Sequence, residues 1–513
     1  MAKFSFRNRK DYLQRLKSEE LDVLIVGGGI NGVGVLRDLC LRRHSSGPLR
    51  LGLIEKDHFG SAASSKNSQL LHGGLRYLKY FDFGLVREAL RERARLLKIA
   101  PHVTWRQSFL MPVYSRGEGW YYRLGLLLYD RLAGSRSLGK SRWLSAHEAL
   151  REEPGLKSDG LHGTLLFYDG RMQASRLLLD QLRESVEREA LACNFVRYEK
   201  ILEQEGRAMG VLARDLLTGE QLEIRARTLV FTVGAWEEST PLRLSRGSHL
   251  ILPRLIKGRH ALAFFEQHGR IIFVLPYGPG RDFTLVGTTE KEQVSPESVE
   301  MDAEEENYLR GQLQNVLSEN ADLTTFGCFS ALRPLIAHDP SRPAGALSRK
   351  HKIWKTAGNV YHLGGGKWTT FRQMAEELTD RLTRDHFPQL GPCRTAELPV
   401  DGNNRPLLQD LTAKAGELAR EYGVPLDSAK TLIESYGRRA PEVLELCRDP
   451  ELSRPLIPGL PLIHAQIPWA IENDMIGRLD DFLTLSTPLG YIHRVTPAER
   501  ERWKQYFEMT TDN

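Results

Sequence analysis

The chain has 513 residues, which is too long for one ordinary hydrophobic core and predicts two or three domains. Its 41% hydrophobic and 27% charged residues are typical of a globular protein, and a net charge of only +6 does not indicate a nucleic-acid partner. No run of about 18 apolar residues occurs, which excludes a transmembrane helix. The five cysteines are scattered without a C-x-x-C pair, so the sequence predicts a reducing cytoplasm, no disulfide framework and no metal site.

The first predicted unit is a buried strand, residues 21–26, followed by a tight turn and the start of a helix. Three glycines follow the strand at G-x-G-x-x-G spacing: Gly27, Gly29 and Gly32. This spacing lets a pyrophosphate approach the backbone at a helix N-terminus. A second strand, residues 51–54, ends in Glu55, whose carboxylate is placed for the ribose hydroxyls of adenosine and disfavours a 2′-phosphate. The expected ligand is a dinucleotide other than NADP.

A small, polar segment follows this second strand and is too irregular for a core element. In a dinucleotide-binding protein it would lie along the pyrophosphate and the edge of an isoalloxazine ring. Ser64 and Ser65 are candidates for phosphate contacts, with an ordinary serine turn as the alternative. His72-Gly73-Gly74 predicts a tight turn that presents Arg76 and Tyr77.

Two helices are predicted next, and the first of them, residues 83–99, is expected to be scaffold. The second, residues 119–132, is the most hydrophobic short piece of the chain. On a helical wheel its far side is covered by Tyr121, Leu124, Leu128 and Leu132. It is too short to span a bilayer, so an aromatic-rich helix with arginines beside it either lies in a membrane interface or is a buried core helix.

The pattern changes to short strands and turns between residues 247 and 289, which predicts a separate antiparallel sheet. Its strands are expected at residues 248–252, 270–275 and 282–286. His249 lies at the start of the first strand. It is either a half-buried structural histidine or a neutral imidazole that can abstract a hydroxyl proton near pH 7.

Arg333 follows a predicted strand, which Pro334 is expected to end. The planar guanidinium of an arginine grips phosphate or carboxylate through two hydrogen bonds, so Arg333 and Arg76 are candidates for anion binding. For each of them taken singly, an ordinary surface arginine is the alternative.

A second glycine loop, residues 364–370, lies between a predicted strand at 360–363 and a predicted helix at 371–384. Its Lys367, beside a helix N-terminus, would stabilise the anionic reduced ring of a flavin, whereas a nicotinamide has no use for such a feature. A structural turn is the alternative. After residue 405 the chain is predicted to form amphipathic helices, among them 411–422 and 428–436.

Several of these segments carry a family resemblance, and the most specific is Leu71-His-Gly-Gly-Leu-Arg-Tyr-Leu78. The other matching segments are 27–34, 247–249, 287–289, 333–335, 348–349, 364–372 and, in the helical tail, 467–481. Together they resemble the FAD-dependent, quinone-linked glycerol-3-phosphate dehydrogenases.

The resemblance implies a Rossmann-like FAD-binding domain of the glutathione-reductase or D-amino-acid-oxidase type, an antiparallel-sheet substrate domain and a C-terminal helical domain. We expect a basic N-terminal extension at 1–20 and interleaved FAD and substrate domains at 21–400. The substrate sheet is expected mainly at 100–180 and 245–345, and the helical domain at 401–513.

The implied activity is oxidation of sn-glycerol 3-phosphate to dihydroxyacetone phosphate by hydride transfer to FAD. Arg76 and Arg333 carry over as ligands of the substrate phosphate and hydroxyls, and Tyr77 as a pocket wall. His249 carries over as the candidate base, and Lys367 as a contact of flavin and substrate. The implied cofactor-binding residues are Gly27, Gly29, Gly32, Glu55, Ser64, Ser65, His72, Gly73, Gly234, Gly365, Gly366, Lys367 and Thr369.

The resemblance also implies that electrons pass to a membrane quinone and that the protein attaches peripherally to the inner surface of the cytoplasmic membrane. In such proteins the segment that matches 120–132 belongs to the membrane-facing surface. A homodimer is left open. One departure from the family is Gln69, which stands where the family usually has lysine. It leaves open a related phosphorylated polyol as substrate; an oxidase that uses O₂ and a non-enzymatic flavin-stabilised membrane protein are further alternatives.

Overall fold

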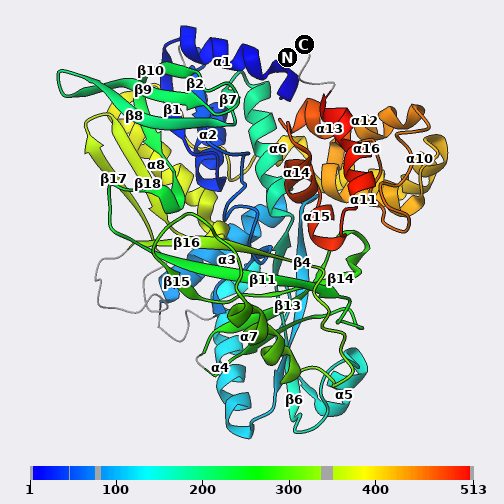
Figure 1. Ribbon diagram of the computed structural model, residues 1–513. Helices are drawn as coiled ribbons and strands as arrows, with labels where there is room; N and C mark the ends of the chain where they lie inside the picture. Colours follow the sequence, from blue (N-terminus) through cyan, green and yellow to red (C-terminus); the bar gives the residue numbers. More distant parts are fainter. Residues whose placement is uncertain (1–3, 45–46, 76–81, 268, 337–349, 509–513) are drawn as a thin grey trace.

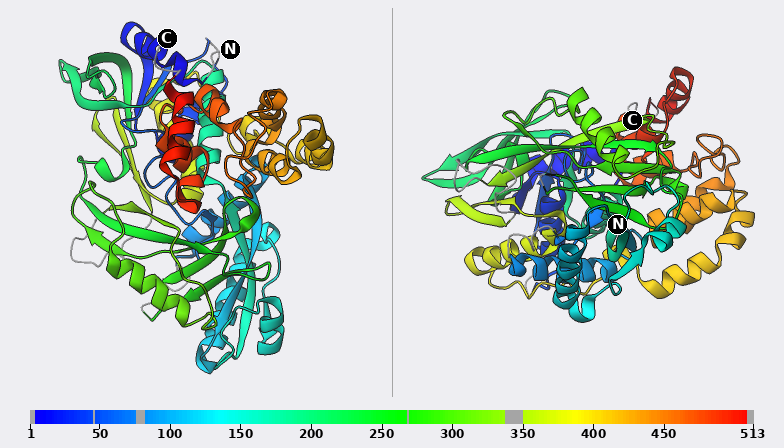
Figure 2. Two further views of the ribbon diagram at one scale, coloured as in Figure 1. Left: turned by 45° about the vertical axis from the view of Figure 1, so that its right-hand side comes forward. Right: turned by 90° about the horizontal axis from the view of Figure 1, so that it is seen from below.

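The computed structural model describes residues 4–44, 47–75, 82–267, 269–336 and 350–508. One sheet carries the predicted nucleotide fold, a second sheet lies below it, and the C-terminal helices lie beside both (Figure 1). Figure 2 shows the helices of the orange segment projecting to one side of the molecule. Among all the residues that the structure describes, no helix is long and apolar enough to cross a membrane.

The first sheet has the strand order β17-β18-β10-β1-β2-β7, with the hairpin β8–β9 attached through β10. Its strands are β1 Leu21–Val26, β2 Leu51–Ile54, β7 Leu191–Cys193, β8 Val196–Gln204, β9 Arg207–Asp215, β10 Gln221–Phe231, β17 His351–Ala357 and β18 Val360–Gly365. Strand β1 is parallel to both of its neighbours, β2 and β10, and β18 is parallel to β10. The strands expected at 21–26, 51–54 and 360–363 are thereby confirmed.

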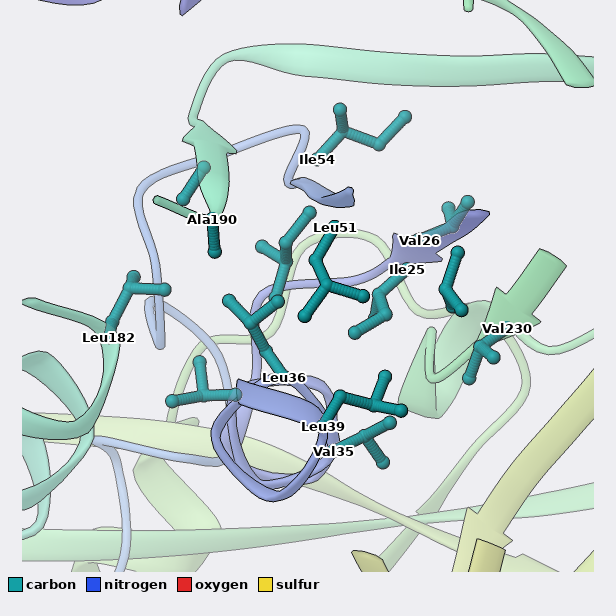
Figure 3. Close-up of a cluster of buried hydrophobic side chains, with 14 of the residues drawn as sticks. Ile25, Val26, Val35, Leu36, Leu39, Leu51, Ile54, Leu182, Ala190 and Val230 are labelled. Atoms are coloured by element: carbon teal, nitrogen blue, oxygen red, sulfur yellow. The ribbon is translucent and has the colours of Figure 1, made fainter. Parts of the chain in front are cut away.

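Helices α2 (Ile30–Leu41), α6 (Ala174–Glu187) and α8 (Phe371–His386) pack together beside this sheet. Figure 3 shows Leu36 and Leu39 of α2 pointing at Ile25 and Leu51 of the strands. This apolar contact follows from the near-continuous hydrophobic runs of β1 and β2, because parallel strands are buried on both faces. The segment expected to be an N-terminal extension contains helix α1 (Arg9–Ser18), which packs against β7 and β10.

The second sheet has the strand order β15-β11-β14-β13-β12-β4-β6-β3, with β16 paired to β11 and β5 paired to β6. Its strands are β3 Leu70–Leu71, β4 Thr104–Val113, β5 Arg142–Ser145, β6 Gly163–Met172, β11 Leu242–Pro253, β12 Ala261–Phe265, β13 Ile271–Tyr277, β14 Phe283–Gly287, β15 Lys291–Gln293 and β16 Gly327–Ile336. The three strands predicted from the sequence lie in β11, β13 and β14, which pair antiparallel.

Pro334 does not end the strand that carries Arg333, contrary to the sequence-based expectation. Strand β16 continues to Ile336, and Pro334 lies opposite Leu244 of β11. Within the described residues β16 pairs with β11 alone, and an edge strand tolerates a proline because one of its sides needs no N–H donors.

Helices α3 (Phe83–Ile99) and α4 (Arg116–Ala133) pack against each other and against this second sheet, and α5 (Ala146–Glu152) and α7 (Ala303–Gln314) also lie beside it. Helix α3 has the bounds that the sequence predicts. The wheel-based expectation for α4 is only partly right, because Leu128 and Leu132 are half-buried. Its outer surface is instead made by Trp120, Tyr121, Leu124 and Leu127.

The C-terminal helices are α9 Arg405–Ala413, α10 Ala415–Glu421, α11 Leu426–Tyr436, α12 Ala440–Glu445, α13 Gln466–Asn473, α14 Leu479–Asp481, α15 Leu489–Ile492 and α16 Pro497–Glu508. The prediction of a single helix at 411–422 is wrong, because the helix is interrupted at Lys414, between α9 and α10. The break lets Leu411 of α9 and Ala419 of α10 enter the same buried cluster.

Candidate functional site

The first glycine loop has the geometry that an anion requires at the N-terminus of a helix. Gly27 has a φ of +108°, and Gly29 is the N-cap of α2. A methyl group added at Gly32 would lie 2.0 Å from the carbonyl oxygen of Gly27. Gly27 and Gly32 therefore cannot carry side chains, and a Cβ at Gly29 would lie 3.2 Å from the hydroxyl of Ser64. The small residues let a ligand approach the backbone at the N-terminus of α2.

Glu55 lies at the carboxyl end of β2, beside the glycine loop. Its Oε2 accepts a hydrogen bond of 2.7 Å from the N–H of Gly28, and its Oε1 accepts one from Asp57. Burial raises the pKa of this carboxyl group above its usual range. A carboxylate with further lone pairs at this edge of a parallel sheet has the position that binds ribose hydroxyls.

Ser64 connects the polar loop to both glycine loops. Its Oγ accepts the N–H of Ile30 at the start of α2, over 2.9 Å, and its carbonyl oxygen accepts the indole N–H of Trp368. Ser65 instead donates its hydroxyl to the carbonyl of Ala62 inside its own turn. Of the two predicted phosphate contacts, Ser64 therefore lies at the helix N-terminus.

The second glycine loop lies against the His-Gly-Gly turn. Gly365 and Gly366 both have positive φ angles, +70° and +84°. Lys367 is the residue before the short helix at 368–370, and Thr369 donates its hydroxyl to the carbonyl of His72 over 3.4 Å. The fold thereby brings together predicted cofactor residues that are almost three hundred positions apart.

Gly234 lies at the end of β10, the strand next to β1, with a φ of +60° and open space beside it. Gly73 donates its backbone N–H to the hydroxyl of Tyr129, over 2.9 Å, and that hydroxyl donates to Asp169. Tyr129 belongs to α4, so the inner face of this helix fixes the His-Gly-Gly turn. The predicted residues Arg76 and Tyr77 follow this turn and lie outside the described residues.

Arg333 lies on β16 with its guanidinium against the backbone of β11. Its Nη2 donates to the hydroxyl of Thr288 over 2.7 Å, and a methyl group added at Gly247 would lie 2.2 Å from that nitrogen. Gly247 is therefore small because the guanidinium occupies the space beside it. The contact joins β11 and β16, which are neighbours in the sheet although they are about 85 residues apart in the sequence. Their pairing places Gly247 opposite Ala331, two residues from Arg333 on the same strand.

His249 lies two residues further along β11 and is 3% exposed. Its ring stacks on Phe329, and a methyl group at Gly287 would lie 2.3 Å from its Cδ2. Its Nε2 is 2.8 Å from the hydroxyl of Ser68, and its Nδ1 has no hydrogen-bond partner within the described residues. Burial, with the nearby Arg333, lowers the pKa of His249 to about 3, so the ring is neutral at pH 7.

A cavity of about 140 Å³ lies between the His-Gly-Gly turn and the second sheet. One part of its lining is polar and includes Arg333, Thr288 and Arg270. The rest is largely apolar and includes Phe109, Met111, Phe167, Ala263, Ile271 and Phe273. Arg270 and Thr288 were not predicted as site residues. The Gly287-Thr-Thr289 segment was a signal for Thr288, whereas Arg270 has no local motif.

Two helix N-termini beside glycine loops, a carboxylate at the end of β2 and a cavity beneath them define a dinucleotide-binding oxidoreductase. Residues 22–381 match the family model described as FAD dependent oxidoreductase, and residues 393–500 match the model for the C-terminal domain of alpha-glycerophosphate oxidase. The chain belongs to this FAD-dependent oxidoreductase family, and relatives of about 30% identity over most of the chain are named glycerol-3-phosphate dehydrogenases.

Three comparisons illustrate the relationship. The probable mitochondrial glycerol-3-phosphate dehydrogenase of Caenorhabditis elegans is 32% identical, over 95% of this chain and 71% of the relative. The aerobic glycerol-3-phosphate dehydrogenase of Bacillus subtilis is 30% identical, over 94% of this chain and 90% of the relative. The glycerol-3-phosphate dehydrogenase of Bacillus halodurans, solved in complex with FAD, superposes with a TM-score of 0.77 at 25% identity and covers 99% of this chain and 94% of its own.

FAD, the cofactor of the family, fits the residues that are present. The adenosine end would meet Glu55, and the pyrophosphate would meet the N-terminus of α2 beside Ser64. The flavin end would lie between the His-Gly-Gly turn and the second glycine loop with Lys367. At each of these places the chain has a glycine where a Cβ would take the space or the φ angle is positive.

Proposed function

We propose that the protein oxidises sn-glycerol 3-phosphate to dihydroxyacetone phosphate and passes the electrons to a membrane quinone. The observation that carries the proposal is a buried neutral histidine, His249, close to an arginine, Arg333, that lines the cavity. Bound FAD supplies the acceptor for the hydride that leaves C2 of the substrate.

His249 is proposed to take the proton of the C2 hydroxyl as the C–H bond breaks. A neutral imidazole has one nitrogen with a free lone pair, and the Nε2 of His249 is already bonded to Ser68. If Nε2 donates its hydrogen to Ser68, Nδ1 is the acceptor. The low pKa keeps the ring unprotonated over the physiological pH range, so its free lone pair can accept a hydrogen bond from that hydroxyl.

Arg333 is proposed to hold the substrate through its phosphate or hydroxyl oxygens. Its Nη2 is fixed by Thr288, which keeps the planar fork in one orientation over Gly247. Arg270, which lines the same cavity and pairs with Glu266, adds a second guanidinium. Two arginines suit a substrate that carries a phosphate dianion, and Lys367 is proposed to contact the flavin and the substrate.

The quinone part of the proposal is supported by the apolar lining of the cavity. Glycerol 3-phosphate has no large apolar surface, whereas a quinone ring does. Phe109 and Phe167 stack in parallel at a centroid distance of 5.1 Å, and Phe273 meets Phe109 edge-on. An oxidase that reduces O₂ needs no such surface.

Peripheral attachment to a membrane, proposed for its cytoplasmic face, is supported as to the attachment by the outer surface of α4. Trp120, Leu124 and Leu127 are 74%, 67% and 47% exposed, although large apolar side chains are usually covered. Exposed basic residues lie in the same helix and just after it: Arg123, Arg131, Arg136, Lys140 and Arg142. An apolar stripe flanked by cations is typical of a helix that lies in a membrane interface.

The test is anaerobic flavin bleaching. Purified protein should be yellow, lose its colour on addition of glycerol 3-phosphate under nitrogen, and regain it on addition of a short-chain quinone. Bleaching by another phosphorylated polyol at a higher kcat/KM would favour the divergent-substrate alternative. Rapid recovery of colour with O₂ alone, with peroxide formed, would favour the oxidase, and a yellow protein that no polyol bleaches would favour the non-enzymatic one.

A further inference from the structure

Gln69 uses both ends of its side-chain amide to join two segments of backbone. Its Oε1 accepts the N–H of Ala174, the first residue of α6, over 2.7 Å. Its Nε2 donates to the carbonyl of Ser65 over 2.9 Å. The amide is therefore occupied by main-chain groups, so the missing lysine charge is not replaced by a substrate contact of Gln69.

The backbone of Gln69 is held as firmly as its side chain. Its N–H donates to Oδ1 of Asn67 over 2.8 Å, and its carbonyl accepts the N–H of Met172 over 3.0 Å. Gln69 also has a φ of +56°, an uncommon conformation for a residue with a side chain. Four hydrogen bonds therefore stabilise a strained backbone at this one position.

The helix that Gln69 caps is itself fixed by buried ion pairs. Arg176, in the first turn of α6, donates to Asp474 of the C-terminal helices over 2.5 Å and to Asp180 over 2.9 Å. Arg183, about two turns further along α6, also donates to Asp474, over 3.2 Å. Asp474 is fully buried, so this end of α6 is a rigid anchor.

The residue before Gln69 in the chain is the hydrogen-bond partner of His249. Ser68 Oγ and His249 Nε2 are 2.8 Å apart, and no other hydrogen bond holds the imidazole within the described residues. We propose that Gln69 is a positioning residue, which holds Ser68 against His249 by tying the loop to the N-terminus of α6. This inference rests on the proposed role of His249 as the base.

The amide is the side chain that this position requires. Lysine has three donors and no acceptor, so Gln69→Lys would keep the bond to Ser65 and leave the N–H of Ala174 unsatisfied. Glutamate has acceptors and no donor, so Gln69→Glu would keep the bond to Ala174 and oppose the carbonyl of Ser65. Both variants keep a side chain at the same positive φ, so the backbone strain cancels in the comparison.

The experiment compares the purified holoenzymes of Q69K, Q69E and the wild type. Turnover of glycerol 3-phosphate is measured with a soluble dye acceptor, per mole of bound flavin, from pH 5 to pH 9. Both variants should lower kcat by about tenfold with little change in KM, because misplaced reacting groups slow the chemical step. The acid limb of kcat should also move towards neutral pH, since a loosened Ser68 admits water to His249.

The matched control is Q173A. Gln173 precedes α6, and its Nε2 donates to the carbonyl of Glu434 over 3.4 Å, so it touches the same helix end without touching the loop. Its kcat and pH profile should be those of the wild type.

Two results would overturn the inference. If Q69K binds substrate more tightly and keeps its kcat, the position governs charge and not geometry. If both variants lose only thermal stability or flavin content, with turnover per flavin unchanged, Gln69 is merely structural. The variant H249Q tests the underlying assignment of the base. If H249Q is active, His249 is not the base and the proposed function fails at that point. If H249Q is inactive and the Gln69 variants are active, only the positioning role of Gln69 is refuted.

Discussion

The guanidinium of Arg333 lies flat against Gly247, so close that a methyl group on this glycine would fall 2.2 Å from Nη2 and 2.5 Å from Cζ. We therefore expect Gly247→Ala to displace the guanidinium and to lower kcat/KM by about tenfold or more without a change in flavin content. Steady-state kinetics and flavin absorbance measure both quantities. Unchanged kinetics would mean that substrate does not contact this arginine.

Arg333→Lys should be almost as harmful as Arg333→Ala. Lysine keeps the positive charge but cannot donate to Thr288 and to the substrate from one rigid plane. A lost charge-assisted contact is worth about 1.5 to 3 kcal/mol, which corresponds to roughly tenfold or more in kcat/KM. A lysine variant with near wild-type kcat/KM would contradict bidentate binding by Arg333.

The burial of His249 should make the folded protein less stable at acid pH. Because burial lowers its pKa to about 3, the unfolded chain binds a proton below pH 6.5 that the folded chain refuses. The contribution of His249 to the free energy of unfolding is complete above pH 6.5 and is lost as the pH falls. At pH 5 the loss is about 2 kcal/mol, which lowers the melting temperature of a chain of this size by roughly 2 °C. Thermal melts of the wild type and H249Q at pH 8 and pH 5 measure it. Equal acid sensitivity of the two proteins would show that the ring is charged or exposed.

The outer face of α4 can be tested without touching its inner face. Trp120, Leu124 and Leu127 replaced together by glutamine should release the protein from vesicles that contain anionic lipid. Flavin content and activity with a soluble dye should stay, because none of these side chains is buried. Three exposed apolar residues elsewhere, Met209, Leu216 and Leu217, make a matched control. Their replacement by glutamine should leave vesicle binding unchanged, and release by both triple variants would sink the membrane role of α4.

Gly32→Ala should abolish FAD binding or folding, since its Cβ would lie 2.0 Å from the carbonyl oxygen of Gly27. Gly125 is the matched control, because nothing lies within 4 Å of its Cβ position in the middle of α4. Gly125→Ala should keep the flavin and add up to about 1 kcal/mol of stability from helix propensity. A flavin-replete Gly32→Ala protein would refute the close approach.

The sequence predicted the parts of the fold that local patterns specify. Strands β1 and β2 and the glycines between them follow from apolar runs and spacing, and α3 follows from its apolar periodicity. The outward face of α4 did not follow, because a wheel does not reveal which residues a neighbouring element covers. Tyr129 and Ala133 are buried in a cluster with Leu90 of α3, which turns Trp120 and Leu127 outward.

The candidate site was predictable where a motif carried it, and not where distant strands create it. His249 and Arg333 were found as residue types, but the reason for Gly247 and Gly287 lies in side chains on neighbouring strands. Gln69 could be recognised only as a missing lysine. Its hydrogen bonds to Ser65 and Ala174 depend on how the polar loop meets α6, which no local pattern in the sequence specifies.

Tyr129 gives α4 a mechanical connection to the site. The tyrosine hydroxyl accepts a hydrogen bond from the N–H of Gly73 and donates one to Asp169. Asp169 also accepts a hydrogen bond from the guanidinium of Arg93. A shift of α4 would therefore act on the turn that precedes Arg76 through the hydrogen bond between Tyr129 and Gly73. If α4 lies on lipid, the turnover rate will depend on the detergent or bilayer that contacts this helix. Kinetic constants measured in different detergents or lipids will then differ because the His-Gly-Gly turn is held differently.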